Sequence, residues 1–477
     1  MTADWPERLP PPAGAALRLL GSPLGALVAR PWFDRAALWG LARWYFPLSR
    51  AWAAASAADG SVERFLAELP LPRLPAGSER GVVAALRRVA SLRAAHEAAD
   101  RRWQAAFFGD GPGPGFAGGF AEASAAAALV AAERRRRAAS HAYMMARAAF
   151  VGLARRAALP AVRYAVPRQD EVERRHGAAL ARPETAYTPP DPLPEIEESR
   201  AVPGPLGPEY WLRFAGIGTA AGGPAWAHVY EPDGVRDPPS LVYGHGVGVE
   251  LDSLDGVSDG IDAIVRQGVR LVRLEAPWHG RRRLPGRYGG EPFFATQPLG
   301  ALDLFAAELR EFATLIAWCR RRGSARVALG GISLGALAAQ LAACHARQWP
   351  AALKPDALFL ATTGADVVGL VAASSLAHAL GLPPALAEGG WTAAELARWR
   401  PLIDPLGEPA PAPADIVMLL GRTDDVTPFA DGRALAARWR VPAENLFLPR
   451  RGHFSAALGL LHDPAPLRRL ALRLQRG

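Results

Sequence analysis

Cysteine and lysine are almost absent from this 477-residue sequence. The two cysteines, Cys319 and Cys344, lie in apolar stretches with helical spacing, which suits a reduced compartment and excludes a cysteine-rich metal site. Lys354 is the only lysine among 55 basic residues, so the net charge of +9 comes from arginine. Because acidic residues are interleaved with these arginines and no nucleic-acid-binding motif is present, we predict no nucleic-acid partner.

Long apolar runs suited to crossing a membrane are also lacking. Residues 327–346 contain a Gly-Gly turn, and residues 367–387 are interrupted by a histidine and two prolines. The first residues include Asp4, and Arg18 breaks the apolar run that follows, which argues against a secretory signal. The expected localisation is therefore cytoplasmic.

The length and composition predict a globular protein of two or more compact units. Half of the residues are apolar and 21% are charged, which is ordinary globular usage. Residues 189–208 contain seven prolines and cannot continue a helix. We predict a linker there, between a helical N-terminal region (1–188) and a second domain (209–477).

The N-terminal region is rich in Ala, Leu and Arg at helical spacing and has almost no β-branched alternation. Within residues 17–52, four tryptophans alternate with arginines: Trp32, Trp39, Trp44 and Trp52 with Arg30, Arg35, Arg43 and Arg50. This composition suits peripheral contact with a membrane surface or packing on the second domain. We favour packing.

After residue 208, short β-rich runs alternate with helical stretches, a pattern that predicts a mostly parallel sheet with helices on both faces. The predicted strands are residues 240–244, 269–277, 325–331, 357–363, 414–421 and 444–449, with one or two more at the sheet edge within 213–230. Functional sites of such α/β sheets lie beyond the carboxyl ends of the strands, so reactive side chains are expected there.

A G-x-S-x-G motif, Gly331 to Gly335, stands between a predicted strand and an Ala-rich helix. A nucleophilic serine is presented on such a sharp turn, and small residues two positions before and after it let strand and helix approach. Ser333 is therefore the candidate nucleophile. The alternative is a serine that only caps the helix.

A serine hydroxyl needs a base, and the base needs a carboxylate that holds it in one tautomer. His453 follows the last predicted strand and is the candidate base. Asp424, in the acidic turn after the preceding strand, is the first choice for the carboxylate, followed by Asp425 and then Asp366.

Stabilising an oxyanion requires backbone N–H donors, one of them from the residue after the nucleophile. That residue is Leu334. The second donor is expected from the glycine-rich stretch GHGVG (244–248), with Val247 as first candidate and Gly246 as the alternative.

Residues 210–477 resemble the α/β-hydrolase superfamily through GHGVG (244–248), GISLG (331–335), GRTDDVTP (421–428) and GHF (452–454), in the order Ser, Asp, His. The resemblance implies an eight-stranded, mostly parallel sheet, with Ser333, Asp424 and His453 as the triad. It also implies a lid inserted after the sixth strand, and residues 367–411 fit that position.

The resulting hypothesis is a serine hydrolase that cleaves small-molecule carboxylic esters with an apolar acyl or alcohol group, through an acyl-enzyme and without cofactor or metal. An acyltransferase using the same triad is the alternative among enzymes, and a non-catalytic membrane-docking or binding protein is the alternative outside them. The sequence specifies neither the substrate nor the oligomeric state.

Overall fold

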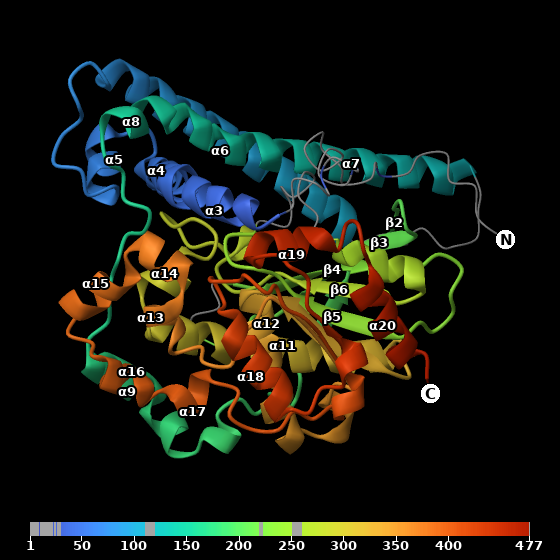
Figure 1. Ribbon diagram of the computed structural model, residues 1–477. Helices are drawn as coiled ribbons and strands as arrows, with labels where there is room; N and C mark the ends of the chain where they lie inside the picture. Colours follow the sequence, from blue (N-terminus) through green and yellow to red (C-terminus); the bar gives the residue numbers. More distant parts are fainter. Residues whose placement is uncertain are drawn as a thin grey trace.

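The computed structural model of the chain describes residues 9, 22, 25, 30–109, 120–218, 223–249 and 260–476. Asp4 and Arg18, on which the expected lack of a secretory signal depends, lie outside these ranges. A group of helices from the N-terminal part of the chain lies along one side of a sheet that has helices on both faces (Figure 1). The predicted α/β class with a helical N-terminal region is thus confirmed.

The sheet has ten strands in the order β1-β3-β4-β6-β5-β7-β8-β9-β10, with β2 paired to β3. From β6 through β5, β7, β8 and β9 to β10 all pairings are parallel, whereas β1, β2 and β4 pair antiparallel with β3, and β4 pairs antiparallel with β6. The strands are β1 (Ile196–Glu198), β2 (Val202–Pro203), β3 (Pro208–Phe214), β4 (Ala225–Tyr230), β5 (Ser240–Gly244), β6 (Arg270–Leu274), β7 (Val327–Ile332), β8 (Ala357–Ala361), β9 (Ile416–Leu419) and β10 (Leu446–Phe447).

Strands β5 to β10 occur at the six predicted stretches. Every residue of β5, β6, β7, β8 and β9 is buried, as expected for parallel strands covered on both faces. The count of ten exceeds the implied eight because the Pro-rich segment 189–208 contributes β1 and β2. That segment is therefore part of the sheet edge, and the domain boundaries themselves stay a prediction.

Helices cover the two faces of the sheet through separate apolar clusters. On one face α11, α12 and α18 pack against the strands, and on the other α20 does so. These and the adjoining helices are α10 (Glu291–Ala295), α11 (Leu299–Arg321), α12 (Leu334–His345), α18 (Phe429–Arg438), α19 (His453–Gly459) and α20 (Ala465–Leu474).

Five short helices separate β8 from β9, at the position where the resemblance implies a lid. They are α13 (Leu370–Ala373), α14 (Ser375–Leu380), α15 (Leu382–Glu388), α16 (Ala393–Ala397) and α17 (Arg400–Ile403). We refer to residues 367–411 as the helical insertion. Its role as a lid stays a prediction.

The N-terminal region contains α3 (Pro31–Gly40), the π-helical turn η1 (Leu41–Tyr45), α4 (Phe46–Ala58), α5 (Val62–Glu68), α6 (Glu79–Phe108), α7 (Phe120–Met145), the 3-10 turn η2 (Ala146–Phe150), α8 (Val151–Arg156) and α9 (Gln169–Ala181). Of residues 120–124 only the backbone is described. Helices α6 and α7 run along each other at the outer side of the molecule (Figure 1).

Several apolar contacts hold this region against the sheet and its covering helices (the sheet domain), and two of them involve α4 and α6. In the first, residues of α4 such as Trp52 share a buried cluster with Phe294 of α10 and Leu376 of α14. In the second, Trp103 of α6 packs against Trp211 of β3 and Trp226 of β4, with ring centroids 5.1 and 6.1 Å away. The helical region thus packs on the sheet domain and touches the helical insertion.

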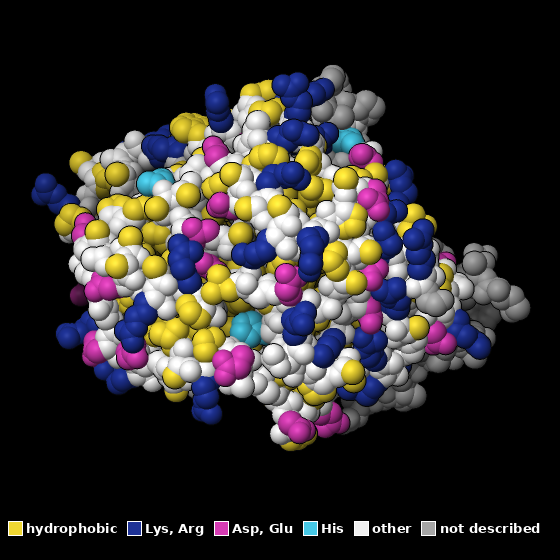
Figure 2. Space-filling view, turned by 60° about the horizontal axis from the view of Figure 1, so that its bottom comes forward, with side chains coloured by type: hydrophobic (Ala, Val, Ile, Leu, Met, Phe, Trp, Pro, Cys, Tyr) yellow, Lys and Arg dark blue, Asp and Glu magenta, His cyan; other side chains and the backbone are white. Residues whose placement is uncertain are grey.

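The four N-terminal tryptophans have different environments. Trp52 is buried and Trp44 is partly buried, whereas Trp32 and Trp39 on α3 are 58% and 63% exposed. Basic and acidic side chains are interspersed on the face of the molecule shown in Figure 2. In the described part of the chain, no helix is both long and apolar enough to cross a bilayer.

Candidate active site

Ser333 occupies the sharp turn between β7 and α12. Its backbone has φ 52° and ψ −119°, a strained conformation for a residue with a side chain. The turn requires two glycines: a Cβ at Gly331 would lie 2.2 Å from the Gly335 carbonyl carbon, and one at Gly335 would lie 2.2 Å from Gly244. The Ser333 side chain makes no capping hydrogen bond to α12, so the helix-cap alternative does not account for it.

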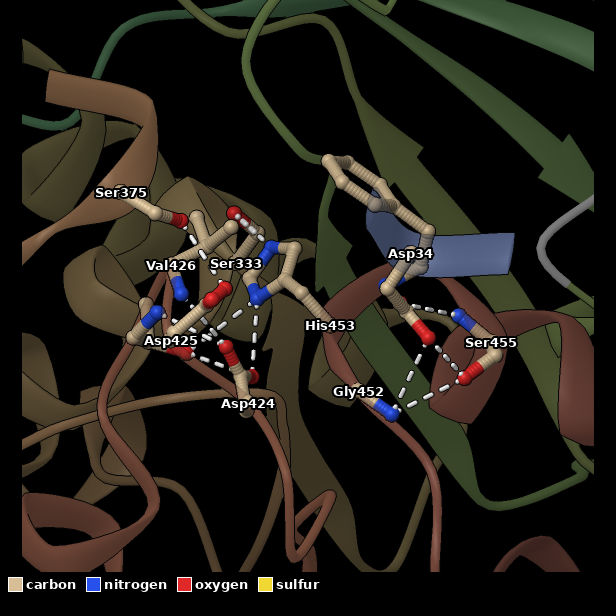
Figure 3. Close-up of polar contacts among 11 residues, drawn as sticks. Asp34, Ser333, Ser375, Asp424, Asp425, Val426, Gly452, His453 and Ser455 are labelled. Atoms are coloured by element: carbon tan, nitrogen blue, oxygen red, sulfur yellow. Dashed lines mark hydrogen bonds and ion pairs between the residues drawn. The ribbon is translucent and has the colours of Figure 1, made fainter. Parts of the chain in front are cut away.

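The side chains of Ser333, His453 and Asp424 are linked in that order by hydrogen bonds (Figure 3). His453 is the first residue of α19, and its Nε2 lies 3.0 Å from Ser333 Oγ. Its Nδ1 lies 2.9 Å from Asp424 Oδ2. These three residues come from the ends of β7, β9 and β10, so the parallel sheet brings together side chains that are up to 120 positions apart.

The Asp424 carboxylate is held by further donors from its own turn. Oδ1 accepts hydrogen bonds from the backbone N–H groups of Val426 and Thr427, both at 2.9 Å. The Thr427 hydroxyl donates to Oδ2 at 2.9 Å and also lies 3.3 Å from His453 Nδ1. The carboxylate is therefore fixed in a buried position beside the imidazole.

The other two predicted carboxylates have different partners. Asp425 accepts a hydrogen bond from the hydroxyl of Ser375, the first residue of α14. Asp366 forms an ion pair with Arg400 within the helical insertion. Of the three candidates, Asp424 is the one bonded to His453.

The predicted oxyanion donors surround Ser333. Gly246 is so close to Ser333 that a Cβ on it would lie 3.6 Å from the serine Cβ, and Val247 and Leu334 line the same cavity as Ser333. Within the described residues, none of the N–H groups of Gly246, Val247 and Leu334 has a hydrogen-bond acceptor. They are therefore available to a bound group.

Two buried histidines, His245 and His279, fix the Gly246–Gly248 loop through hydrogen bonds. His279 Nε2 accepts the Gly248 N–H at 3.1 Å, and His245 Nε2 accepts the Ala276 N–H at 3.1 Å. A ring nitrogen that accepts a hydrogen bond carries no proton, so both imidazoles are neutral. Burial lowers the pKa of His245 well below its usual value, which supports this state.

An apolar cavity of about 80 Å³ opens beside Ser333, between the sheet domain and the helical insertion. Most of its lining side chains are aliphatic or aromatic: Val247, Phe293, Phe294, Pro298, Ala301, Leu334, Leu337, Val367, Val368, Leu370, Val371, Leu376, Ala377, Leu382, Leu396, Ile403 and Val426, with Gln297, Ser333, Ser374 and Thr427 as the polar members. In the part of the chain that the structure describes, no group of His, Cys, Asp or Glu side chains is arranged to hold a metal ion.

Several residues around the site were not predicted from the sequence. Thr427 lies in the GRTDDVTP motif, where its place three residues after Asp424 could have marked it. His279 belongs to the stretch PWHG (277–280), whose place after a predicted strand suggested the pocket mouth, but its hydrogen bond to Gly248 was not predicted. Asp34 of the N-terminal region accepts the N–H groups of Gly452 and Phe454, on either side of His453, and the Tyr45 hydroxyl donates to the Gly248 carbonyl oxygen. No local pattern in the sequence marks Asp34 or Tyr45.

Residues 261–369 match a family model described as alpha/beta hydrolase domain containing 18. This match agrees with the strand order and the serine turn. The chain has the α/β-hydrolase fold. The matched segment makes up less than a quarter of the chain and includes Ser333 but neither Asp424 nor His453.

Solved structures similar to this chain include acetyl xylan esterase 1 from Thermoanaerobacterium sp. JW/SL YS485, with 16% identity, a TM-score of 0.41 and coverage of 63% of this chain and 95% of the other. An esterase from Pyrobaculum calidifontis has 15% identity, a TM-score of 0.37 and coverage of 65% and 93%. A lipase in its open form has 15% identity, a TM-score of 0.37 and coverage of 54% and 98%. At this degree of similarity these structures say nothing about the reaction or substrate of this chain. No curated protein sequence matches it.

Proposed function

We propose that this chain is a serine hydrolase that cleaves carboxylic esters through an acyl-enzyme. The observation that carries the proposal is the row of hydrogen bonds from Ser333 Oγ to His453 Nε2 and from His453 Nδ1 to Asp424. A serine hydroxyl near neutral pH is a weak nucleophile until a base takes its proton, and a carboxylate on the other ring nitrogen selects the tautomer that can do so.

The reaction proceeds in two displacements. His453 Nε2 takes the Ser333 proton while Oγ forms a bond to the ester carbonyl carbon, and the proton then passes to the departing alcohol as its C–O bond breaks. In the second displacement His453 takes a proton from water, whose oxygen bonds to the acyl carbon. The proton returns to Ser333 as the carboxylic acid leaves. Asp424 orients the imidazole and stabilises its charged form in both halves.

The carbonyl oxygen becomes negatively charged in both tetrahedral intermediates. We assign its stabilisation to the Leu334 N–H together with the N–H of Val247 or Gly246. Because the neutral His279 and His245 fix this loop, its donors are oriented before substrate arrives, which is what makes such donors effective in catalysis.

The cavity beside Ser333 supports a small, apolar acyl group as the preferred one. Its volume is about 80 Å³, and an apolar protein cavity of roughly 150 Å³ holds a benzene molecule. We therefore expect the highest kcat/KM among p-nitrophenyl esters for acyl chains of about two to four carbons. A preference for chains of about twelve carbons would contradict this assignment.

The test of the reaction itself is covalent labelling. A fluorophosphonate probe should label the wild-type chain, and Ser333→Ala should abolish both labelling and ester hydrolysis, with a loss on the order of 10⁶ in turnover. Ser91→Ala is the control, because Ser91 is an exposed serine of α6 that does not line this cavity. Undiminished turnover in Ser333→Ala would refute the proposal.

Two alternatives share parts of this arrangement. An acyltransferase would use the same acyl-enzyme but pass the acyl group to an alcohol, and product analysis with an added alcohol acceptor distinguishes it from a hydrolase. A non-catalytic protein that contacts a membrane surface is the second alternative, and the exposed Trp32 and Trp39 would make that contact. Sedimentation with lipid vesicles tests it.

A further inference from the structure

A carboxylate from the N-terminal region lies against the loop that carries His453. Asp34, on α3, is 8% exposed, and both of its oxygens accept hydrogen bonds from this loop (Figure 3). Oδ1 accepts the N–H groups of Phe454 and Ser455 at 2.7 and 3.0 Å. Oδ2 accepts the Gly452 N–H at 3.2 Å and the Ser455 hydroxyl.

These donors include the first N–H groups of α19, which have no partner inside the helix. A side chain at the residue before a helix usually accepts them, but that residue here is Gly452, which has none. Asp34 therefore does from another helix what a local capping side chain does elsewhere. The glycine makes room for it, because a Cβ on Gly452 would lie 2.4 Å from the Asp34 carboxyl carbon.

We propose that Asp34 is a positioning residue for His453. It bonds the backbone on both sides of the histidine, at Gly452 and at Phe454, and so fixes the point from which the imidazole reaches Ser333. The inference rests on the proposed function, in which His453 is the base. Displacing a catalytic group by about 1 Å can cost about a hundredfold in rate, so a loosened backbone at this point affects the chemical step.

The two oxygens of Asp34 accept from three backbone N–H groups and one hydroxyl, so an amide cannot accept from all of them. In Asp34→Asn the NH₂ group faces either the Gly452 N–H or the N–H groups of Phe454 and Ser455 and repels them, whereas the Ser455 hydroxyl can turn to accept from it. The substitution keeps the shape of the side chain, which separates the loss of these hydrogen bonds from a loss of packing.

The experiment compares Asp34→Asn with Asp100→Asn. Asp100 is the matched control, because its carboxylate also joins the N-terminal region to the sheet domain, at Arg281, but away from the His453 loop. For each variant, kcat and KM for a short p-nitrophenyl ester and the rate constant and final amplitude of fluorophosphonate labelling are measured.

For Asp34→Asn we expect kcat and the labelling rate constant to fall by about tenfold to a hundredfold, with KM and the amplitude of one probe per chain nearly unchanged. Asp100→Asn should change each of these by less than about threefold. A purely stabilising role of Asp34 would instead lower the amplitude and leave the rate constant unchanged, and that result would overturn the proposal.

Gly452→Ala provides a second route if Asp34→Asn does not fold. Gly452 has φ −92°, which alanine adopts, so its methyl group acts by displacing the Asp34 carboxylate. The same fall in rate constant at full amplitude is expected, and a wild-type rate constant would overturn the proposal. Failure of the wild-type chain to be labelled or to hydrolyse esters would refute the proposed function, and this inference with it.

Discussion

Asp425 and Ser375 are joined by two hydrogen bonds, from the serine hydroxyl to the carboxylate and from the serine N–H to the Asp425 carbonyl oxygen, both at 2.9 Å. Ser375 is the first residue of α14 in the helical insertion. The neighbouring Asp424 is bonded to His453 instead. Two adjacent carboxylates therefore act on different parts of the molecule, one on the insertion and one on the imidazole.

This arrangement predicts different effects of removing each charge. Asp424→Asn should lower kcat by about 10³ to 10⁴, because the amide favours the wrong imidazole tautomer. Asp425→Asn keeps an oxygen for Ser375 and should cost less than about tenfold. Steady-state hydrolysis of one ester by both variants checks the prediction, and a crippled Asp425→Asn beside an active Asp424→Asn would contradict it.

Arg50 and Glu291 form a fully buried ion pair between α4 and α10. Arg50→Met leaves the Glu291 carboxylate buried without its closest cation, which should lower the free energy of unfolding by about 3 kcal/mol. Adding Glu291→Gln removes that charge while keeping an acceptor for the Arg163 N–H, and should recover most of the loss. Urea unfolding of the wild type, of Arg50→Met and of the double variant measures the three free energies of unfolding. If Arg50→Met lies within about 1 kcal/mol of the wild type, the prediction is wrong.

His245 predicts a loss of stability in mild acid. Its folded pKa lies well below the value of about 6.5 that it has in the unfolded chain, because it is buried. Below about pH 6.5 the unfolded chain therefore takes up a proton that the folded chain does not, and the free energy of unfolding falls by up to about 1.4 kcal/mol per pH unit.

The slope of unfolding free energy against pH, measured between about pH 7.5 and about pH 5, tests this. His245→Gln should reduce the slope. Burial lowers the pKa of His345 to about 4, so His345 also makes the unfolding free energy fall as the pH is lowered. His345→Gln is therefore the comparison, and it should remove only the part of the slope that His345 causes. An unchanged slope in His245→Gln would show that folding does not lower the pKa of this histidine.

Removing residues 1–200, which also takes away the edge strand β1, should expose the surface that the N-terminal helices cover. Tyr288, Phe294 and Leu376 of the sheet domain share a buried cluster with α4, and Trp211 and Trp226 lose the α6 side chains that cover them. The fragment 201–477 should be poorly soluble or bind hydrophobic dyes, because large exposed apolar patches are unusual on soluble proteins. A soluble, fully active fragment, together with vesicle binding by the isolated N-terminal piece, would favour membrane docking instead.

The residues around Ser333 were predictable because their constraints are local. Gly331 and Gly335 are required within a few positions of the serine, and the alternating strands and helices predict the edge at which such turns meet. Asp424 was preferred over Asp425 by its place in a turn, which is also local.

Asp34 and the Arg50–Glu291 pair could not be predicted, because their partners are distant in the sequence. Asp34 is an ordinary acidic residue in the first turn of a helix, and only the packing of α3 on α19 makes it a capping group. Strands β1 and β2 were missed for another reason: they are two or three residues long and lie at the sheet edge, where proline is tolerated. Most of β3 also precedes the edge region 213–230 in which strands were predicted.

The bond between Asp34 and Gly452 links residues 418 positions apart. During synthesis Asp34 leaves the ribosome 418 residues before Gly452, so the start of α19 receives its capping carboxylate only after the whole segment between them has been made. Contacts of such high sequence separation form late in folding, because the long loop between them must be closed first. Recovery of esterase activity after dilution from denaturant would therefore lag behind recovery of helical signal, and partly made chains would be inactive.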